Sequence, residues 1–141
     1  MFLSATVITY NEERNIERCL NSLIGVADEI IVVDAHSTDR TRDICRRYGA
    51  AITERPFTGY GSQRQYAASL ARGAYVLSID ADEVLGERLR ENIAAVKSRG
   101  FGHRMYAFRV VNYICGRPVR YSGMAPSLQT RLFDKRYASW N

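Results

Sequence analysis

The chain has 141 residues, of which 46% are hydrophobic and 25% are charged, and its net charge is +5 at neutral pH. This length suits one ordinary domain, so we expect residues 1–141 to form a single domain. The composition is that of a globular protein, and no apolar run approaches the length needed to span a bilayer. Three cysteines without C-x-x-C spacing also argue against a disulfide framework or a zinc site.

Strands and helices are predicted to alternate through the first hundred residues. Apolar runs bounded by polar turns predict strands at Leu3–Tyr10, Glu29–Asp34, Ala51–Glu54 and Tyr75–Asp80. Helical spacing of apolar residues predicts helices at Ile16–Leu23, Arg40–Tyr48, Ser62–Ala71 and Val84–Ser98. Two further strands are predicted at Arg104–Ile114 and Leu128–Phe133. This order indicates the α/β class, with a mostly parallel sheet covered by helices on both faces.

Three loops that follow predicted strands are rich in acidic and hydroxyl groups. They span residues 9–13, 34–39 and 80–83. In open α/β sheets, ligands bind outside the carboxyl ends of the strands, where such loops meet the starts of helices. We therefore expect one cleft to gather all three loops.

The third loop carries Asp80 and Asp82 directly after an apolar strand. Two carboxylates at this spacing can hold Mg²⁺ or Mn²⁺, which prefer oxygen ligands. The alternative is a solvated turn in which Asp82 caps the next helix and Asp80 faces water. The sequence has neither G-x-G-x-x-G after its first strand nor a P-loop. A carboxylate-rich cleft would then bind a diphosphate through a divalent cation, because bare carboxylates repel phosphate.

Four segments resemble, in their order and spacing, the inverting family 2 glycosyltransferases, whose nucleotide-sugar-binding domain has the GT-A fold. The segments are residues 7–13, 31–41, 57–67 and 77–83. The resemblance implies a metal-dependent transferase that moves a sugar, expected to be a hexose, from a nucleoside diphosphate donor to an acceptor hydroxyl with inversion.

The resemblance assigns the nucleoside side of the donor pocket to the first two loops. Thr9, Tyr10 and Glu12 would line the pocket, and Asp34 would hydrogen-bond the base. A carboxylate suits the imide N–H of uracil, which favours a UDP-sugar as donor. Asp34 can instead be read as an ordinary strand-end cap. Asp39 is expected to cap the second helix.

The same resemblance assigns the diphosphate side to the helix after Gly61 and to the third loop. Arg64 would approach the diphosphate, although it can also be read as a solvated arginine on a helix. Gln65 departs from the asparagine that usually follows this basic residue in the family. Asp80 would contact the ribose or the metal, and Asp82 would ligate Mg²⁺ or Mn²⁺. Glu83 is expected to begin the following helix.

The second half resembles the small bacterial glycosyltransferases of lipopolysaccharide core assembly. The likeness rests on N-Y-x-x-G at residues 112–116 and R-L-F at residues 131–133. The implied acceptor is an envelope saccharide or a lipid-linked saccharide. Relatives continue beyond the equivalent of Trp140-Asn141, so we expect the chain to be the N-terminal part of a longer protein.

The general base that an inverting transfer needs is not identified. The subgroup often has an acid after the proline equivalent to Pro126, but here Ser127 follows it. Asp134 is a candidate base, with a surface ion pair as the alternative. Neither His36 nor His103 is assigned as a catalyst.

Three other functions fit part of the sequence. A nucleotide-sugar-binding or interaction module without turnover would explain the unassigned base. A sugar nucleotidyltransferase would share the fold, but Asn11-Glu12-Glu13 replaces its usual glycine-rich basic loop. Nucleic-acid binding has only the positive charge in its favour, so no nucleic-acid partner is expected.

The start of the chain has neither a basic leader nor an A-x-A cleavage pattern. We therefore expect a cytoplasmic protein. Its basic surface would allow peripheral contact with the inner face of the cytoplasmic membrane.

Overall fold

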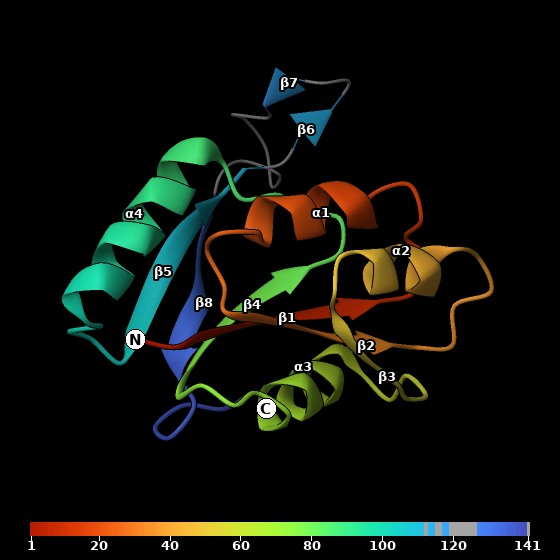
Figure 1. Cartoon of the computed structure of the whole chain (residues 1–141), viewed down its shortest axis with the longest axis horizontal. Helices are drawn as coiled ribbons and strands as arrows, with labels where there is room; N and C mark the ends of the chain where they lie inside the picture. The colour runs from red at the N-terminus through yellow and green to blue at the C-terminus, as the bar shows by residue number, and fades with distance from the viewer. Residues whose placement is uncertain (112, 115–116, 119–126, 141) are drawn as a thin grey trace.

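The structure is a computed structural model that describes residues 1–111, 113–114, 117–118 and 127–140 (Figure 1). Its main sheet has six strands: β1 (Leu3–Thr9), β2 (Glu29–Asp34), β3 (Ala51–Glu54), β4 (Tyr75–Asp80), β5 (Met105–Val110) and β8 (Ser127–Asp134). They lie in the order β3-β2-β1-β4-β8-β5. The first four strands in this order are parallel, and β8 runs antiparallel to both of its neighbours. The predicted α/β sheet, mostly parallel, is confirmed.

The pairing of β1 with its two neighbours determines where the predicted functional loops begin. Thr9 lies opposite Asp34 of β2, and Ile8 lies opposite Asp80 of β4. Because these parallel strands end together, the three acidic loops start at one edge of the sheet. Strand β8 runs the other way, so that Asp134 pairs with Tyr75 at the opposite edge.

The helices are α1 (Ile16–Leu23), α2 (Thr41–Arg47), α3 (Tyr60–Ser69) and α4 (Glu87–Arg99). Figure 1 shows α1 and α2 on one face of the sheet and α3 on the other. One core cluster joins Leu3 and Val7 to residues of α1, α2 and α4, and a second joins Ile31 and Val76 to α3. The side chains of β1, β2 and β4 are therefore buried on both faces of the sheet, as their continuous apolar runs predict, whereas β3 at the edge is half-exposed. Within the described part of the chain, no helix is long and apolar enough to cross a bilayer.

Helix α4 begins at Glu87, later than its predicted start at Val84. The preceding backbone groups are satisfied by side chains instead of a helical turn. The amide of Asp80 donates to Glu83 Oε1 at 2.7 Å, and the amide of Leu85 donates to Ser22 Oγ at 3.1 Å. The expectation that Glu83 begins this helix is therefore wrong, because its carboxylate closes the turn after β4.

The predicted strand at Arg104–Ile114 is divided in the structure. Strand β5 ends at Val110, and the short β6 (Tyr113–Ile114) pairs with β7 (Arg117–Pro118) in a separate two-stranded sheet. The N-Y-x-x-G motif lies largely outside the described residues.

Candidate active site

A cleft of about 750 Å³ lies at the edge of the sheet where β1, β2 and β4 end. Its walls come from the three predicted loops and from the start of α3. The predicted site residues that line it are Thr9, Tyr10, Glu12, Arg64, Asp80 and Asp82. The structure thus brings the predicted donor and metal residues to one place, with the exception of Asp34.

The first two loops are held together by hydrogen bonds. Asn11 has a left-handed backbone with φ of 49°, a conformation that asparagine adopts more readily than most residues. Its amide donates to Ser37 Oγ at 2.9 Å, and its side-chain Oδ1 accepts the amide of Thr38 at 2.8 Å. The next amide, of Glu12, donates to Thr41 Oγ1 at 2.9 Å. These bonds hold the wall after β1 in a fixed position against the loop after β2.

Asp39 holds the start of α2, as predicted. Its Oδ1 accepts the amide of Thr41 at 2.9 Å, and its Oδ2 accepts the amide of Glu13 at 3.2 Å. Burial tends to raise the pKa of Asp39, but the hydrogen bonds from Thr41 and Glu13 outweigh it and hold the pKa below its ordinary value. The carboxylate form is therefore the one that stabilises both loops.

Replacing Asp39 by asparagine is expected to cost about 1 kcal/mol at neutral pH, because the amide nitrogen cannot accept the N–H of Glu13. A lowered pKa in the folded state contributes stability above the unfolded value of about 3.9, and this stability is lost as the pH falls through the folded pKa. The difference in urea midpoint between the two proteins should thus shrink on acidification. Asp43→Asn, on the exposed side of α2, is the matched control. A difference that stays constant with pH would contradict the assignment.

Asp34 is buried and does not line the cleft. Its carboxylate accepts the amide of Ser37 at 2.8 Å and also bonds the Ser37 hydroxyl, while Arg42 Nε lies 3.8 Å away. Ala35 lines the cleft in its place. In this geometry the Asp34 carboxylate does not face a bound base, because its two oxygens accept hydrogen bonds from the amide and the hydroxyl of Ser37. The structure favours the alternative reading of Asp34 as a strand-end cap.

Polar and aromatic groups line the cleft beside the end of β1. Thr9 lines the cleft, and its Oγ1 is buried without a hydrogen-bond partner among the described residues. The neighbouring Tyr10 ring is 56% exposed. Phe57 and Tyr60 line the cleft as an edge-to-face pair with centroids 5.0 Å apart. The cleft therefore offers flat apolar surfaces next to an unused hydroxyl.

Arg64 of α3 contacts Asp80 at the end of β4. Arg64 Nη2 lies 3.0 and 3.1 Å from the two carboxylate oxygens of Asp80. Arg131 Nη2 lies 3.9 Å from the same carboxylate. Arg64 Nε is buried and has no partner among the described residues. Asp80 is thus neutralised by two arginines, while Arg64 keeps an unused donor.

Two aromatic rings lie against the Arg64 guanidinium, whose carbon is 5.6 Å from the ring centroid of Tyr60 and 5.1 Å from that of Trp140. The amide of Trp140 donates to Gln65 Oε1 at 2.8 Å, and its ring packs edge-on against Phe133. Gln65 therefore anchors the segment that covers Arg64. Trp140 could not be predicted as a site residue, because nothing in the local sequence pattern places it beside α3.

Arg131 of β8 is a second site residue whose role the sequence pattern does not predict. It forms a two-pronged ion pair with Glu83, with distances of 2.7 and 2.9 Å, and its side chain is only 10% exposed. Burial raises the pKa of Glu83, the amide of Asp80 and the charge of Arg131 oppose this rise, and the charge of Asp80 adds to it. The R-L-F motif contains Arg131 but does not identify its partner.

Asp82 is exposed and lines the cleft. No hydrogen bond to its side chain is formed within the described ranges, in contrast to Asp80. The described residues also contain no group of three metal-ligating side chains. A Mg²⁺ site next to phosphates commonly uses one or two carboxylates and completes its shell with substrate oxygens and water. Asp82, with Asp80 beside it, fits a site of this kind.

Asp134 lies away from the cleft. It ends β8 at the opposite edge of the sheet, where its carboxylate bonds Arg136 at 2.6 and 2.9 Å. Hydrogen bonds from Arg136 hold the pKa of Asp134 below its usual range. The structure thus shows Asp134 in an ion pair, which was the alternative to a catalytic role, and does not support Asp134 as the base.

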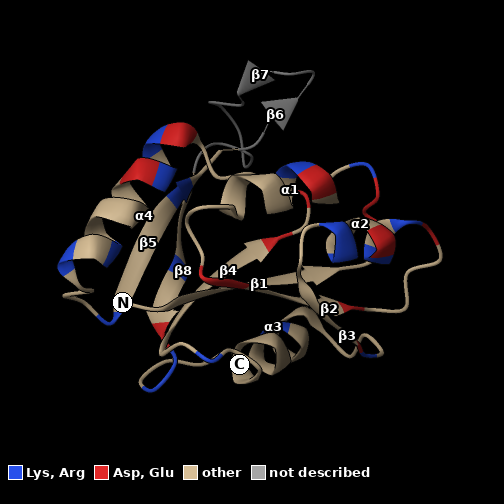
Figure 2. Cartoon of the chain, in the orientation of Figure 1, with Lys and Arg blue, Asp and Glu red and all other residues tan. Residues whose placement is uncertain are grey.

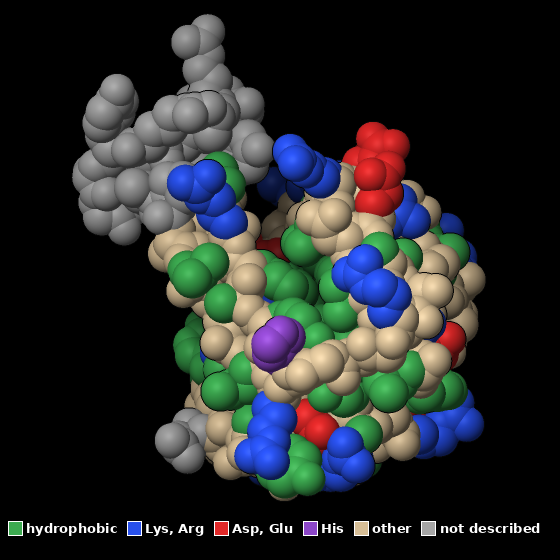
Figure 3. Space-filling view, turned by 90° about the vertical axis from the view of Figure 1, so that its left-hand side faces the viewer, with side chains coloured by type: hydrophobic (Ala, Val, Ile, Leu, Met, Phe, Trp, Pro, Cys, Tyr) green, Lys and Arg blue, Asp and Glu red, His purple; other side chains and the backbone are tan. Residues whose placement is uncertain are grey.

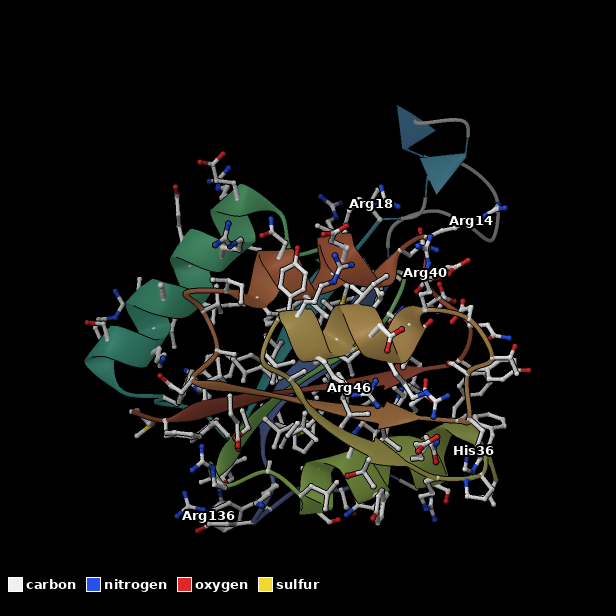
Figure 4. All side chains as sticks on the ribbon, turned by 45° about the vertical axis from the view of Figure 1, so that its right-hand side comes forward. Arg14, Arg18, His36, Arg40, Arg46 and Arg136 are labelled. Carbon is white, nitrogen blue, oxygen red and sulfur yellow. The ribbon has the colours of Figure 1, made fainter. Side chains whose placement is uncertain are left out.

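The two histidines also lie outside the cleft lining. The backbone carbonyl of His103 accepts the Tyr75 hydroxyl at 2.7 Å, at the start of β4. His36 has a left-handed φ of 60° in the loop after β2, and its Nδ1 lies 3.5 Å from Glu54 (Figure 4). Neither histidine supplies the missing base.

A second cavity of about 830 Å³ shares Arg64, Asp80 and Asp82 with the cleft. Its lining mixes apolar and charged side chains, among them Val84, Leu85 and Phe108 together with Arg109 and Arg131. The acidic turn after β4 therefore stands between two spaces, each large enough for a ligand.

The sheet order and the cleft at its carboxyl edge define an α/β protein of the GT-A fold. Glucosyl-3-phosphoglycerate synthase from Mycobacterium tuberculosis, in a crystal structure with Mn²⁺, UDP and glucosyl-3-phosphoglycerate, has a similar fold with a TM-score of 0.59. It is 26% identical, and the match covers 74% of this chain and 42% of that one.

The model of glycosyl transferase family 2 matches residues 4–138. An uncharacterized glycosyltransferase of Rickettsia bellii is 37% identical over 140 residues, which are 98% of this chain and 48% of that protein. The lipopolysaccharide core biosynthesis glycosyltransferase LpsC of Rhizobium meliloti is 38% identical over 94 residues, covering 63% of this chain and 34% of LpsC.

The chain belongs to glycosyl transferase family 2. It spans about half the length of the Rickettsia relatives that it matches.

Proposed function

We propose that the protein transfers a hexose, with inversion, from a nucleoside diphosphate donor to a saccharide hydroxyl. The observation that carries this proposal is the gathering of the predicted donor and metal residues around one cleft at the carboxyl edge of the sheet. The structural neighbour from M. tuberculosis is described with UDP, which supports UDP as the nucleotide.

In the proposed complex, the nucleoside lies beside the end of β1. The Tyr10 ring offers a stacking surface, and the unpaired Thr9 hydroxyl offers a hydrogen bond. Glu12 and Ala35 border the same space, and Asp34 lies behind Ala35 without lining it. The diphosphate then extends toward Arg64, which lines the cleft and whose guanidinium suits phosphate oxygens.

Asp82 would hold Mg²⁺ or Mn²⁺ together with the diphosphate, with Asp80 on the ribose or metal side. When bound, such an ion stabilises the negative charge that develops on the departing diphosphate. Arg64 and Arg131 keep Asp80 neutralised, which reduces its repulsion of the diphosphate. The neighbour that contains Mn²⁺ and UDP supports metal use.

The acceptor is proposed to be an envelope or lipid-linked saccharide, with lipopolysaccharide core as the leading case. The name of LpsC supports this class. The second cavity adjoins the cleft at the acidic turn, so it can admit an acceptor toward the donor sugar. We also propose a cytoplasmic location with peripheral contact at the inner face of the cytoplasmic membrane.

A nucleotide-sugar-binding module without turnover is the second candidate. It is favoured by the position of Asp134, which lies at the opposite edge of the sheet and leaves no assigned base among the described residues. Release of free sugar or transfer to an acceptor would exclude it.

The deciding experiment is a calorimetric screen of nucleotide sugars with and without Mn²⁺. We expect binding of a UDP-sugar that tightens when Mn²⁺ is present. A protein that binds no nucleoside diphosphate sugar under either condition would overturn the proposed function. Binding without any detectable turnover would instead support the second candidate.

Replacing Trp140 by alanine is expected to weaken donor binding about tenfold, because Arg64 loses the ring that holds its guanidinium. Trp140→Phe keeps an aromatic face and should retain most of the affinity. Calorimetry with UDP measures both variants, and their melting temperatures report any loss of folding. Equal affinity of the alanine variant and the unaltered protein would show that Trp140 does not position Arg64.

A further inference from the structure

A surface of basic and aromatic side chains lies at the edge of the sheet opposite the cleft. It forms where β1, β4 and β5 begin and where β8 ends. We call it the basic edge, and it consists of Phe2, Arg72, Arg104, Lys135, Arg136 and Tyr137. Figure 2 shows basic residues in the loop after β8, and Figure 3 shows basic and hydrophobic side chains next to one another at the lower end of the molecule.

Contacts join these residues into one surface. The Arg104 guanidinium lies 3.8 Å from the ring centroid of Tyr137, and that of Arg72 lies 5.3 Å from the ring of Phe2. The backbone of Lys135 bonds to the loop that leads into β4, which also carries Arg72. Cationic and aromatic groups are therefore held together along this edge.

The charge that the basic edge presents to solvent is positive. Arg72 pairs with Glu29, and Arg136 pairs with Asp134, but in each pair the arginine is far more exposed than the acid. The arginine side chains are 74% and 62% exposed, whereas those of Glu29 and Asp134 are 14% and 3% exposed. The carboxylates thus face the protein, and the guanidinium groups face outward. Tyr137 is itself 59% exposed, and its ring lies against Arg104 and Arg136.

We propose that the basic edge docks on an anionic phospholipid bilayer. Arginine and lysine are attracted to the negative potential of such a surface, and tyrosine favours the boundary between water and lipid. Exposed Met105 and Leu70 lie at the same end of the strands and α3 and extend the apolar area. This proposal identifies the surface that makes the membrane contact. It rests on the proposed function, which includes that contact.

The position of the basic edge restricts the acceptor. Strand β4 connects the two edges through six residues, or roughly 20 Å at the usual rise of a strand. A docked protein would therefore hold its cleft about this far from the edge that touches lipid. The acceptor reached in this pose is a saccharide that projects from the bilayer, and not a single sugar at the level of the headgroups.

Co-sedimentation with vesicles tests the docking. We expect binding to phosphatidylcholine vesicles that contain phosphatidylglycerol, no binding to phosphatidylcholine alone, and loss of binding near 1 M salt, where screening acts within about 3 Å. The double variant Arg72→Gln/Arg104→Gln should bind about 25-fold more weakly, or about fivefold per cation. Tyr137→Ser should also weaken binding.

The matched control is Arg14→Gln/Arg18→Gln, which removes the same charge from residues that Figure 4 places far from Arg136. This control is expected to bind vesicles like the unaltered protein. An equal loss in both double variants, or no loss in either, would overturn the docking surface. The docking proposal would also be overturned if the protein bound duplex DNA as tightly as anionic vesicles and Tyr137→Ser did not weaken vesicle binding. The basic edge would then be a general site for polyanions.

Calorimetry with UDP separates this proposal from the proposed function. Variants of the basic edge should bind UDP normally, since the cleft lies at the other edge, and this also shows that they fold. If the unaltered protein binds UDP but does not prefer anionic vesicles to phosphatidylcholine vesicles, the docking alone is overturned. Absence of UDP binding in the unaltered protein would overturn the proposed function, whatever the vesicles show.

Discussion

Asparagine in place of Asp82 is expected to lower the rate of sugar transfer at saturating donor by at least about 100-fold. Asp82 is exposed in the cleft, while the neighbouring Asp80 is held by Arg64. Asp82 is therefore the carboxylate that can bind a divalent ion together with the diphosphate. The transfer rate measured against Mn²⁺ concentration should lose its metal dependence in the variant, because asparagine is a much weaker ligand for a hard cation.

Asp43→Asn provides the control for this substitution. Asp43 is an exposed carboxylate of α2 that pairs with Arg46 and does not line the cleft. Its replacement should leave both the rate and the metal response unchanged. If Asp82→Asn keeps a normal metal response, the assignment of Asp82 as ligand fails. Asp80, released from Arg64, would then be the remaining carboxylate to examine.

Methionine in place of Arg131 is expected to lower the free energy of unfolding by about 3 to 5 kcal/mol. The change removes both prongs of the ion pair and leaves Glu83 in a partly buried position without its cation. It also removes the second positive charge that faces Asp80. Urea unfolding at neutral pH measures the loss.

The double variant Arg131→Met/Glu83→Gln tests the cause of that loss. It should be more stable than Arg131→Met alone, because no uncompensated carboxylate remains next to Asp80. Glu91→Gln, on the exposed surface of α4, serves as a control for neutralising an acid on its own. Independent, additive effects of the two changes would show that the observed pair does not contribute to stability.

The central strands β1, β2 and β4 were predictable because they are buried on both faces, and the half-exposed β3 because polar residues bound its short apolar run. Strands β2, β3 and β4 begin and end at the predicted residues, since continuous apolar runs stop at polar loops. The start of α4 was not predictable from such a pattern. It depends on Ser22 and Glu83, whose side chains satisfy backbone amides before the helix begins.

The site was predictable to the extent that it follows from strand order. Residues at the ends of adjacent parallel strands must meet, and this brings Thr9 and Asp80 to one edge. Asp34 ends a strand at the same edge, but its direction is set by bonds to Ser37, which no spacing reveals. Arg131 and Trp140 act through partners 48 and 75 residues away in the chain, so only the fold identifies them.

The place of β8 between β4 and β5 has a consequence for the order in which the protein assembles during synthesis. Strand β5 leaves the ribosome before β8, yet in the main sheet its pairing partner among the described residues is β8. In the main sheet, β5 therefore stays unpaired until the chain has grown past Asp134. The turn that carries Asp80 and Asp82 also lacks its ion pair until then, because Arg131, the partner of Glu83, belongs to the same late strand. A nascent chain can thus complete its parallel strands early and still be unable to hold the acidic turn in place until β8 inserts.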